Sequence, residues 1–228
     1  MKLKLERTQK EAPGVISFIF NPQDKVEWKP GQFFHYILHH EPTDERGSDR
    51  WFTISAAPFE RNIMITTRIV DDKGSSFKKA LQELKPGEEI EATEIDGDFT
   101  VDNPDKKMVF IAGGIGITPY RSIIKQLDYD KKPVNVTLLY ANRDENIPFK
   151  TEFEQVAKNH PELIIHYVVS PEHIDVAKIQ EQVPDYKERM VYISGPEPMV
   201  EDLGNALKES GLSEDHLKQD WFPGYPKE

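Results

Sequence analysis

The hydrophobic and polar positions divide the chain into two parts of different pattern. From Leu3 to about Thr100, short runs rich in β-branched and aromatic residues alternate with turn residues: VISFIF (15–20), QFFHYILHH (32–40), RWFTIS (50–55), NIMITTRIV (62–70) and EEIEATEI (88–95). Short runs at this spacing are typical of an antiparallel barrel or sandwich. One segment, SSFKKALQEL (75–84), has apolar residues at helical spacing instead, and the following Pro86-Gly87 pair predicts its end.

After the polar segment VDNPDKK (101–107) the pattern changes. Four continuously apolar runs, MVFIAGG (108–114), VNVTLLYAN (134–142), LIIHYVV (163–169) and MVYISG (190–195), alternate with helix-like segments at 120–127, 149–160, 176–183 and 199–210. Apolar strands alternating with helices indicate a parallel sheet that is covered on both faces. We therefore predict two domains: an antiparallel β-barrel of Greek-key type over residues 1–102 and an α/β domain with a parallel sheet over residues 103–228.

The stretch IAGGIGITPYRSII (111–124) follows an apolar strand and leads into a helix, which is the context that a nucleotide-binding glycine loop requires. Gly113, Gly114 and Gly116 would let backbone N–H groups approach a pyrophosphate, and the helix N-terminus adds partial positive charge. Pro119 stands where the dinucleotide fingerprint G-x-G-x-x-G has its third glycine, and proline fits the first turn of a helix. Such a turn is also common for structural reasons alone, so this loop by itself does not decide a function.

Composition excludes several classes of protein. The 228 residues are 37% hydrophobic and 30% charged, as in ordinary globular domains, and they include no cysteine for a disulfide, a thiolate-bound iron–sulfur cluster or a cysteine nucleophile. The net charge of −11 argues against nucleic-acid binding. The longest uncharged run, 108–120, is too short to span a bilayer, and the charged segment 1–14 does not match a signal peptide. We therefore predict a cytoplasmic protein without membrane insertion.

Four motifs occur in a specific order: RWFTIS (50–55), GSSFKKAL (74–81), GGIGITP (113–119) and SGPEPM (194–199). With this combination the sequence resembles the ferredoxin–NADP reductase superfamily, in which an antiparallel flavin-binding barrel precedes a nicotinamide-nucleotide-binding α/β domain. The resemblance covers nearly the whole chain, including KPGQFF (29–34) and the aromatic tail DWFPGY (220–225). It implies a flavin-binding domain at 1–102 and an NAD(P)-binding domain at 103–228.

The resemblance assigns the flavin site to the first domain. Arg50 would bind the flavin phosphate, Phe52 would lie against the isoalloxazine in place of the family's usual tyrosine, and Thr53 would face the flavin N5 as a catalytic residue. The start of the helix at 74–76 would bind a second phosphate, which favours FAD over FMN. The flavin-binding residues implied in this way are Arg50, Trp51, Phe52, Thr53, Arg68, Ile69, Gly74, Ser75 and Ser76.

The resemblance assigns NAD(P)H to the second domain, where Ser194 replaces the cysteine of the family's Cys-Gly-x-x-x-Met signature. Arg143 could grip the 2′-phosphate of NADPH or point into water, and we favour NADPH slightly. Phe222 would stack on the flavin as a second catalytic residue, or would close the last strand as a packed aromatic together with Trp221. The nucleotide-binding residues implied are Gly113, Gly114, Gly116, Thr118, Pro119, Asn142, Arg143, Gly195, Pro196 and Met199.

The function that follows is a flavoprotein reductase that passes hydride from NAD(P)H to bound FAD and then electrons to a separate acceptor. This acceptor is a ferredoxin, a flavodoxin, an oxygenase partner or a small molecule, and the acidic charge weighs against the acidic ferredoxins and flavodoxins. Two alternatives are a non-catalytic nucleotide-binding subunit of a larger electron-transfer complex and a flavin-free dehydrogenase.

Two other features predict no site. His35 and His39 would share one face of a strand, with His40 beside them, but no carboxylate follows at a ligand-like spacing, so we predict no metal site. The polar segment PTDERGSDR (42–50) is interpreted as a plain loop that leads into the flavin motif.

Overall fold

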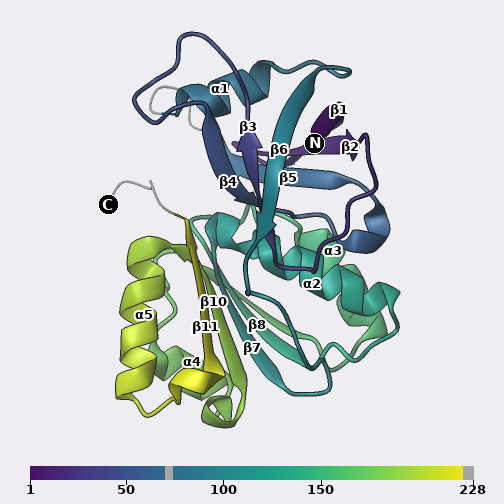
Figure 1. Cartoon of the computed structure of the whole chain (residues 1–228). Helices are drawn as coiled ribbons and strands as arrows, with labels where there is room; N and C mark the ends of the chain where they lie inside the picture. The colour runs from purple at the N-terminus through teal and green to yellow at the C-terminus, as the bar shows by residue number, and fades with distance from the viewer. Residues whose placement is uncertain (70–73, 223–228) are drawn as a thin grey trace.

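A computed structural model of the chain describes residues 1–69 and 74–222, which form two parts stacked one on the other (Figure 1). The first part is a six-stranded antiparallel sheet with the strand order β4-β3-β6-β1-β2-β5, curled into an open barrel. Its strands are β1 (Lys2–Ala12), β2 (Val15–Pro22), β3 (Phe33–Ile37), β4 (Asp49–Thr53), β5 (Ile63–Arg68) and β6 (Glu89–Asp96). The predicted antiparallel barrel is thereby confirmed.

Buried and more exposed residues alternate along these strands, and the buried ones form the interior of the barrel. Phe34 and Tyr36 are buried on β3, and Ile90 and Ala92 are buried on β6, while their sequence neighbours are more exposed. The helix predicted at 75–84 is α1 (Ser76–Glu83), which buries Phe77 and its neighbour one turn later against the barrel. Side chains four residues apart share one face of a helix, so this short helix covers the barrel with a single apolar stripe.

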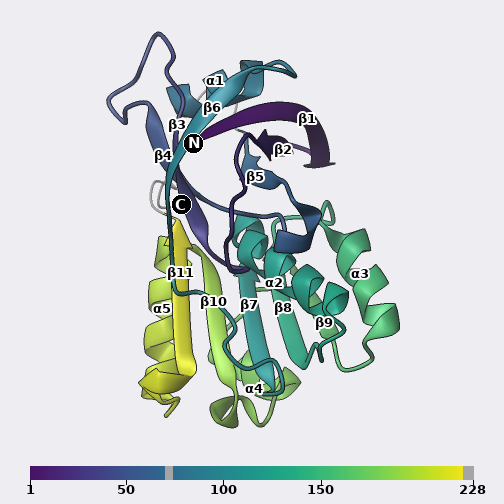
Figure 2. The same ribbon diagram turned by 45° about the vertical axis from the view of Figure 1, so that its right-hand side comes forward.

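The second part is a five-stranded parallel sheet with the order β11-β10-β7-β8-β9. Its strands are β7 (Met108–Gly113), β8 (Val136–Asn142), β9 (Ile164–Val169), β10 (Met190–Pro196) and β11 (Leu217–Phe222). Helices α2 (Thr118–Tyr129) and α3 (Lys150–Asn159) lie on one face, and α4 (Val176–Gln182) and α5 (Glu197–Glu209) lie on the other (Figure 2). Short 3₁₀ turns are η1 (Pro58–Glu60), η2 (Gly114–Ile117), η3 (Tyr186–Glu188) and η4 (Glu214–His216).

Each face of the parallel sheet has its own apolar cluster. Phe110 and Leu138 pack toward α2 and α3 in a cluster that continues into the barrel, whereas Val109 and Ile111 pack toward α4 and α5. Successive residues of a strand point to opposite faces, which explains why β7 is apolar throughout. The predicted α/β architecture is confirmed. Among the described helices, none is both long and apolar enough to cross a membrane.

The order of the parallel strands reverses between β7 and β10. From β7 the chain proceeds outward to β8 and β9, and then returns to the other side of β7 with β10 and β11. In open α/β sheets, ligands bind outside the carboxyl ends of the strands at such a switch point. The glycine loop follows β7 and the SGPEPM motif begins in β10, so both motifs flank this position.

The two parts are joined mainly through α2. Arg121 donates to the backbone oxygen of Ser55 (2.9 Å), Ser122 donates to that of Ala56 (2.7 Å), and Arg121 also pairs with Glu60 (2.8 Å). The connection from β6 to β7, which contains the predicted boundary at 102/103, leads from the first sheet to the second. The carboxyl ends of β10 and β11 point toward β4 in both views (Figures 1 and 2).

Candidate functional site

The register of β3 and β4 decides which way the flavin motif faces. Arg50 lies opposite Tyr36 and Phe52 lies opposite Phe34, so Arg50 and Phe52 share the inner side of the barrel. The Phe52 ring lies 5.8 Å from the ring of Phe77 on α1, and the Arg50 guanidinium lies 5.6 Å from the same ring. The structure thus brings Arg50 and Phe52 to the start of α1. Thr53, the last residue of β4, is buried at its end.

Trp51 points to the opposite side of β4. It lies across from His35, stacks on that ring at 4.6 Å and meets the edge of Phe33 at 5.3 Å. Its side chain is 46% exposed. The structure therefore separates the Trp51 side chain from Arg50 and Phe52, although all three stand in one sequence motif.

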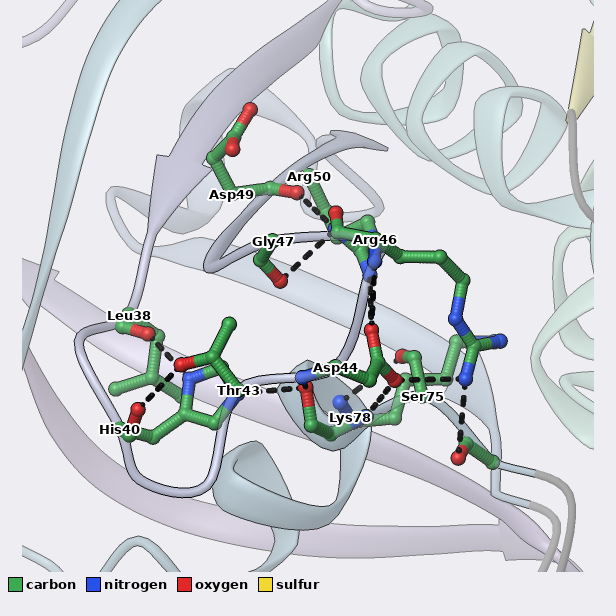
Figure 3. Close-up of polar contacts among 12 residues, drawn as sticks. Leu38, His40, Thr43, Asp44, Arg46, Gly47, Asp49, Arg50, Ser75 and Lys78 are labelled. Carbon is green, nitrogen blue, oxygen red and sulfur yellow. Dashed lines mark hydrogen bonds and ion pairs between the residues drawn. The ribbon is translucent and has the colours of Figure 1, made fainter.

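The N-terminus of α1 is held by short polar contacts. The Ser75 hydroxyl accepts from the backbone N–H of Lys78 (3.2 Å) and caps the helix. The backbone N–H of Ser76 donates to the carboxylate of Asp44 (2.7 Å), and the Ser76 hydroxyl accepts from the backbone N–H of Asp44 (3.0 Å) (Figure 3). The two predicted serines therefore lie at a helix start that already holds an anionic group.

Basic side chains converge on this helix start. Lys78 is mostly buried, and burial together with the charges of Arg50, Arg46 and Arg68 lowers its pKa to about 8. Its ammonium donates to the backbone oxygen of Arg68 (3.2 Å). The sequence reasoning missed Lys78 and Arg46. The signal for Lys78 was its place three residues after the cap Ser75, which puts it in the first turn of the helix.

Residues 42–48 form the loop that the sequence predicts before β4, and this loop also contributes contacts to the polar site. Within this segment Asp44 and Arg46 form an ion pair (2.7 Å), and Arg46 reaches the backbone oxygen of Gly74 (3.4 Å). The Arg50 guanidinium holds the loop through the backbone oxygens of Arg46 (2.5 Å) and Gly47 (3.3 Å). The loop is thus part of the polar site, because its backbone oxygens accept from Arg50 of the flavin motif and its Arg46 side chain donates to Gly74.

The glycine loop packs directly against the SGPEPM motif. A Cβ on Gly116 would overlap the backbone of Ser194, and one on Gly113 would overlap the Met199 sulfur. Gly114 has φ +53°, and nothing lies within 4 Å of where its Cβ would be. Gly113 and Gly116 are therefore required for close approach between the two motifs, and Gly114 is the glycine whose backbone is open to a ligand.

Thr118 and Pro119 begin α2 and are buried there. Proline occupies the first turn, as predicted from its preset φ and missing N–H. The Thr118 hydroxyl donates to the backbone oxygen of Ile115 (3.1 Å) and so closes the turn from within. These two residues shape the loop, while the backbone of Gly114 and Ile115 is its more accessible part.

Ser194 has a largely buried acidic partner that the sequence reasoning missed. Its hydroxyl donates to the carboxylate of Asp220 on the neighbouring strand β11 (3.3 Å). Burial, with a further contribution from the charge of Asp98, raises the pKa of Asp220 to about 7. This contact depends on the pairing of the parallel strands β10 and β11, which no local sequence motif reveals. A carboxyl that titrates near neutrality beside a nucleotide-binding motif is a candidate functional group.

The remaining predicted residues lie at the carboxyl ends of the strands. Asn142 ends β8 and the exposed Arg143 follows it. In β10, Gly195 pairs with Trp221, which is 51% exposed, and Pro196 pairs with Phe222. The Phe222 side chain lies outside the part of the chain that the structure describes.

The histidines take part in other contacts. His35 contacts Thr93 and Asp49, and His40 contacts Ser76 and the backbone oxygen of Leu38. The expectation that His39 shares a strand face with His35 is wrong, because β3 ends at Ile37. In the described ranges, no three His, Asp or Glu side chains are placed to hold a metal ion.

Comparison with known proteins agrees with this geometry. The family described as "Oxidoreductase NAD-binding domain" matches residues 110–204. The chain is 26% identical over 231 residues to a flavohemoprotein from Burkholderia sp. (strain TH2), with 95% of this chain and 57% of that protein covered. It is 27% identical over 206 residues to the ferredoxin reductase component of 3-ketosteroid-9-alpha-monooxygenase from Mycolicibacterium smegmatis, with 87% and 57% covered. The chain thus spans little more than half the length of these curated relatives.

Two solved structures have the same fold. The FAD/NAD-binding domain of nitric oxide dioxygenase from Vibrio cholerae superposes with a TM-score of 0.84 at 21% identity, covering 97% of this chain and 98% of that one. Ferredoxin-NADP+ reductase from Plasmodium falciparum gives 0.81 at 20% identity, covering 97% and 96%. The chain thus shares with both structures the fold of an antiparallel barrel followed by a parallel α/β sheet, and the family described as "Oxidoreductase NAD-binding domain" matches within its second part.

Proposed function

We propose that the protein is an NAD(P)H-dependent flavoprotein reductase that holds FAD on the barrel and NAD(P)H on the parallel sheet. The observation that carries the proposal is the gathering of basic side chains at the start of α1, where Arg46 donates to the backbone oxygen of Gly74 (3.4 Å), the Arg50 guanidinium lies 5.6 Å from the Phe77 ring, and Lys78 stands in the first turn. This cationic site lies beside β4, the strand toward which the carboxyl ends of β10 and β11 point (Figures 1 and 2). A barrel whose only task was to bind an uncharged substrate would not need several cations around one helix start.

The residues at the barrel site fit FAD. A diphosphate carries two negative charges, and the basic side chains together with the helix N-terminus supply donors for both. The Arg50 Nη2 atom is buried and has no hydrogen-bond partner among the described residues. A hollow of about 420 Å³ adjoins the site and is lined by His39, His40, Glu41, Thr43 and Ser48. This space beside the phosphate site supports FAD, which carries an adenosine, over FMN.

The nucleotide site fits a nicotinamide dinucleotide. Gly114 exposes its backbone at the switch point of the sheet, where the dinucleotide pyrophosphate would bind. Bound flavin would supply the hydride-accepting and electron-releasing chemistry. The chain's own residues would orient the two cofactors: Thr53 at the end of β4 on one side, Gly195 and Met199 on the other.

We propose a separate electron acceptor. A 3-ketosteroid monooxygenase and a glycine betaine monooxygenase each have a reductase component among the relatives of this chain. This sequence offers no cysteine thiolates for an iron–sulfur cluster. An oxygenase component or a small molecule therefore agrees better with the chain than a cluster bound within it, and the acidic charge weighs against an acidic carrier protein.

The test is the response of the purified protein to nicotinamide nucleotides without oxygen. We expect yellow protein whose flavin absorption bleaches on addition of NADPH, and whose flavin, released by heat, co-chromatographs with FAD. Coloured protein that neither NADPH nor NADH bleaches would indicate the non-catalytic subunit. Folded protein that stays colourless after incubation with FAD would refute flavin binding and favour the flavin-free dehydrogenase.

A further inference from the structure

Asp44 occupies the place where a phosphate would meet the start of α1. Its Oδ2 accepts from the backbone N–H of Ser76 (2.7 Å) and from the Arg46 guanidinium (2.7 Å), and its Oδ1 accepts from the backbone N–H of Arg46 (3.0 Å) (Figure 3). These donors hold the pKa of the Asp44 carboxyl well below its usual range, so the group is an anion at neutral pH. An anionic pair of oxygens thus lies on a helix N-terminus, as a phosphate would.

The same carboxylate faces the arginine of the flavin motif. Its Oδ1 lies 3.9 Å from the Arg50 Nη2 atom, which has no hydrogen-bond partner among the described residues. Arg50 therefore directs an unused donor toward this spot, and Lys78 adds its charge from the first turn of α1. The site is built for more negative charge than one loop carboxylate supplies.

Contacts around Ser76 hold the loop that carries Asp44. The His40 Nδ1 atom lies 2.6 Å from the backbone oxygen of Leu38 and must donate to it. In neutral His40 the Nε2 atom is then an acceptor, so the Ser76 hydroxyl, 2.8 Å away, donates to it. The same hydroxyl accepts from the backbone N–H of Asp44. Ser76 thus binds the loop through both its backbone and its side chain.

We propose that Asp44 is a built-in competitor of the flavin phosphate, which must displace its carboxylate from the Ser76 N–H and the Arg46 guanidinium in order to bind. The proposal rests on the proposed function. It adds that a residue of the flavin site itself lowers the affinity for flavin. A backbone N–H has a single hydrogen to donate, so the Ser76 N–H cannot serve the carboxylate and a phosphate at full strength together. Two anions on the same donors would also repel each other.

The test is FAD affinity of apoprotein with Asp44→Asn, which keeps the side-chain shape and removes its charge. We expect roughly tenfold tighter binding and faster association, since the contacts to the Ser76 N–H and the Arg46 guanidinium lose the strength that the Asp44 charge gives them. Asp49→Asn is the matched control, because Asp49 belongs to the same segment but pairs with His35 outside the barrel. Unchanged or weaker FAD binding by folded Asp44→Asn would overturn the proposal.

Two further measurements separate this inference from the proposed function. Inorganic pyrophosphate, followed by thermal shift, probes the anion site without flavin, and tighter binding by Asp44→Asn there would support competition even if FAD did not bind. Equal pyrophosphate affinity of both proteins would count against it. If the variant did not fold, a crystal structure of the wild type with FAD would decide. A retained Asp44 contact to the Ser76 N–H would refute displacement, and a broken one would support it.

Discussion

Asp220→Asn should make the protein more stable at neutral and alkaline pH. Asp220 lies on β11, where its carboxylate accepts from the Ser194 hydroxyl and feels the negative charge of Asp98. Burial raises its pKa from 3.8 to about 7, so the folded state disfavours the ionised form. Asparagine keeps an oxygen that can accept from Ser194 and has no charge to bury.

The magnitude follows from the change in pKa. Between pH 3.8 and about 7 the unfolded chain has lost the Asp220 proton while the folded chain still holds it, so folding stability falls as pH rises. The shift is about three units, and each unit corresponds to about 1.36 kcal/mol, which sets an upper bound of about 4 kcal/mol. Because Asp220 keeps some contact with solvent, water screens part of the effect, and we expect about 1–3 kcal/mol above pH 7.

Urea unfolding of wild type and Asp220→Asn from pH 4 to pH 9 measures this difference. All other titrating groups are common to both proteins. The difference between their free energies of unfolding at each pH therefore reports the titration of Asp220 alone. The two stabilities should agree near pH 4, diverge through pH 5–7 and stay apart above it, with the variant more stable. Asp24→Asn, at an exposed carboxylate, serves as the control and should change little. Parallel curves for Asp220→Asn and wild type across pH 5–8 would refute the reasoning.

Three other substitutions test the two sites. Arg50→Ala should weaken flavin binding by about 1.5–3 kcal/mol, the worth of a charged hydrogen bond, and purify largely without flavin, whereas the exposed Arg7→Ala should keep full flavin absorbance. Gly116→Ala should lower the unfolding free energy by about 1–3 kcal/mol in calorimetry, because its Cβ would meet the backbone of Ser194. Arg143→Ala should lower kcat/KM for NADPH roughly tenfold and leave that for NADH nearly unchanged. Equal effects on both nucleotides would show that Arg143 does not bind the 2′-phosphate.

The fold could be predicted from the sequence wherever one strand or helix carried its own pattern. The four apolar strands and their helices were found because burial on both faces leaves an uninterrupted apolar run. The sequence reasoning missed β1 as a separate strand because only its first residues pair with β6, and its charged second half continues as a ribbon with β2 alone. It named a last strand at Trp221 and Phe222 but gave no bounds for it, since this edge strand, LKQDWF, is polar.

The site could be predicted in part for a related reason. The glycine loop and the flavin motif are local sequences, and local sequence decides how a strand turns into a helix. Asp44, Lys78 and Asp220 act through contacts with residues distant in the chain or through burial. Asp44 meets Ser76 across 32 positions, and Asp220 meets Ser194 across 26. Such contacts depend on strand register and loop path, which hydrophobic patterning does not determine.

One helix links the two candidate sites. Helix α2 begins at the glycine loop with Thr118, and one turn later Arg121 donates to the backbone oxygen of Ser55, two residues beyond Thr53 at the end of the flavin motif. The Arg121 side chain is buried and also pairs with Glu60 and Glu152 at 2.8 and 2.9 Å.

A buried charge is costly to leave unpaired, so only a narrow range of orientations between the two parts satisfies this arginine. Hydride transfer requires the donor and acceptor atoms to be held close together and aligned. The ion cluster on α2 therefore fixes the glycine loop relative to the end of β4, which is the alignment that the proposed hydride transfer would require.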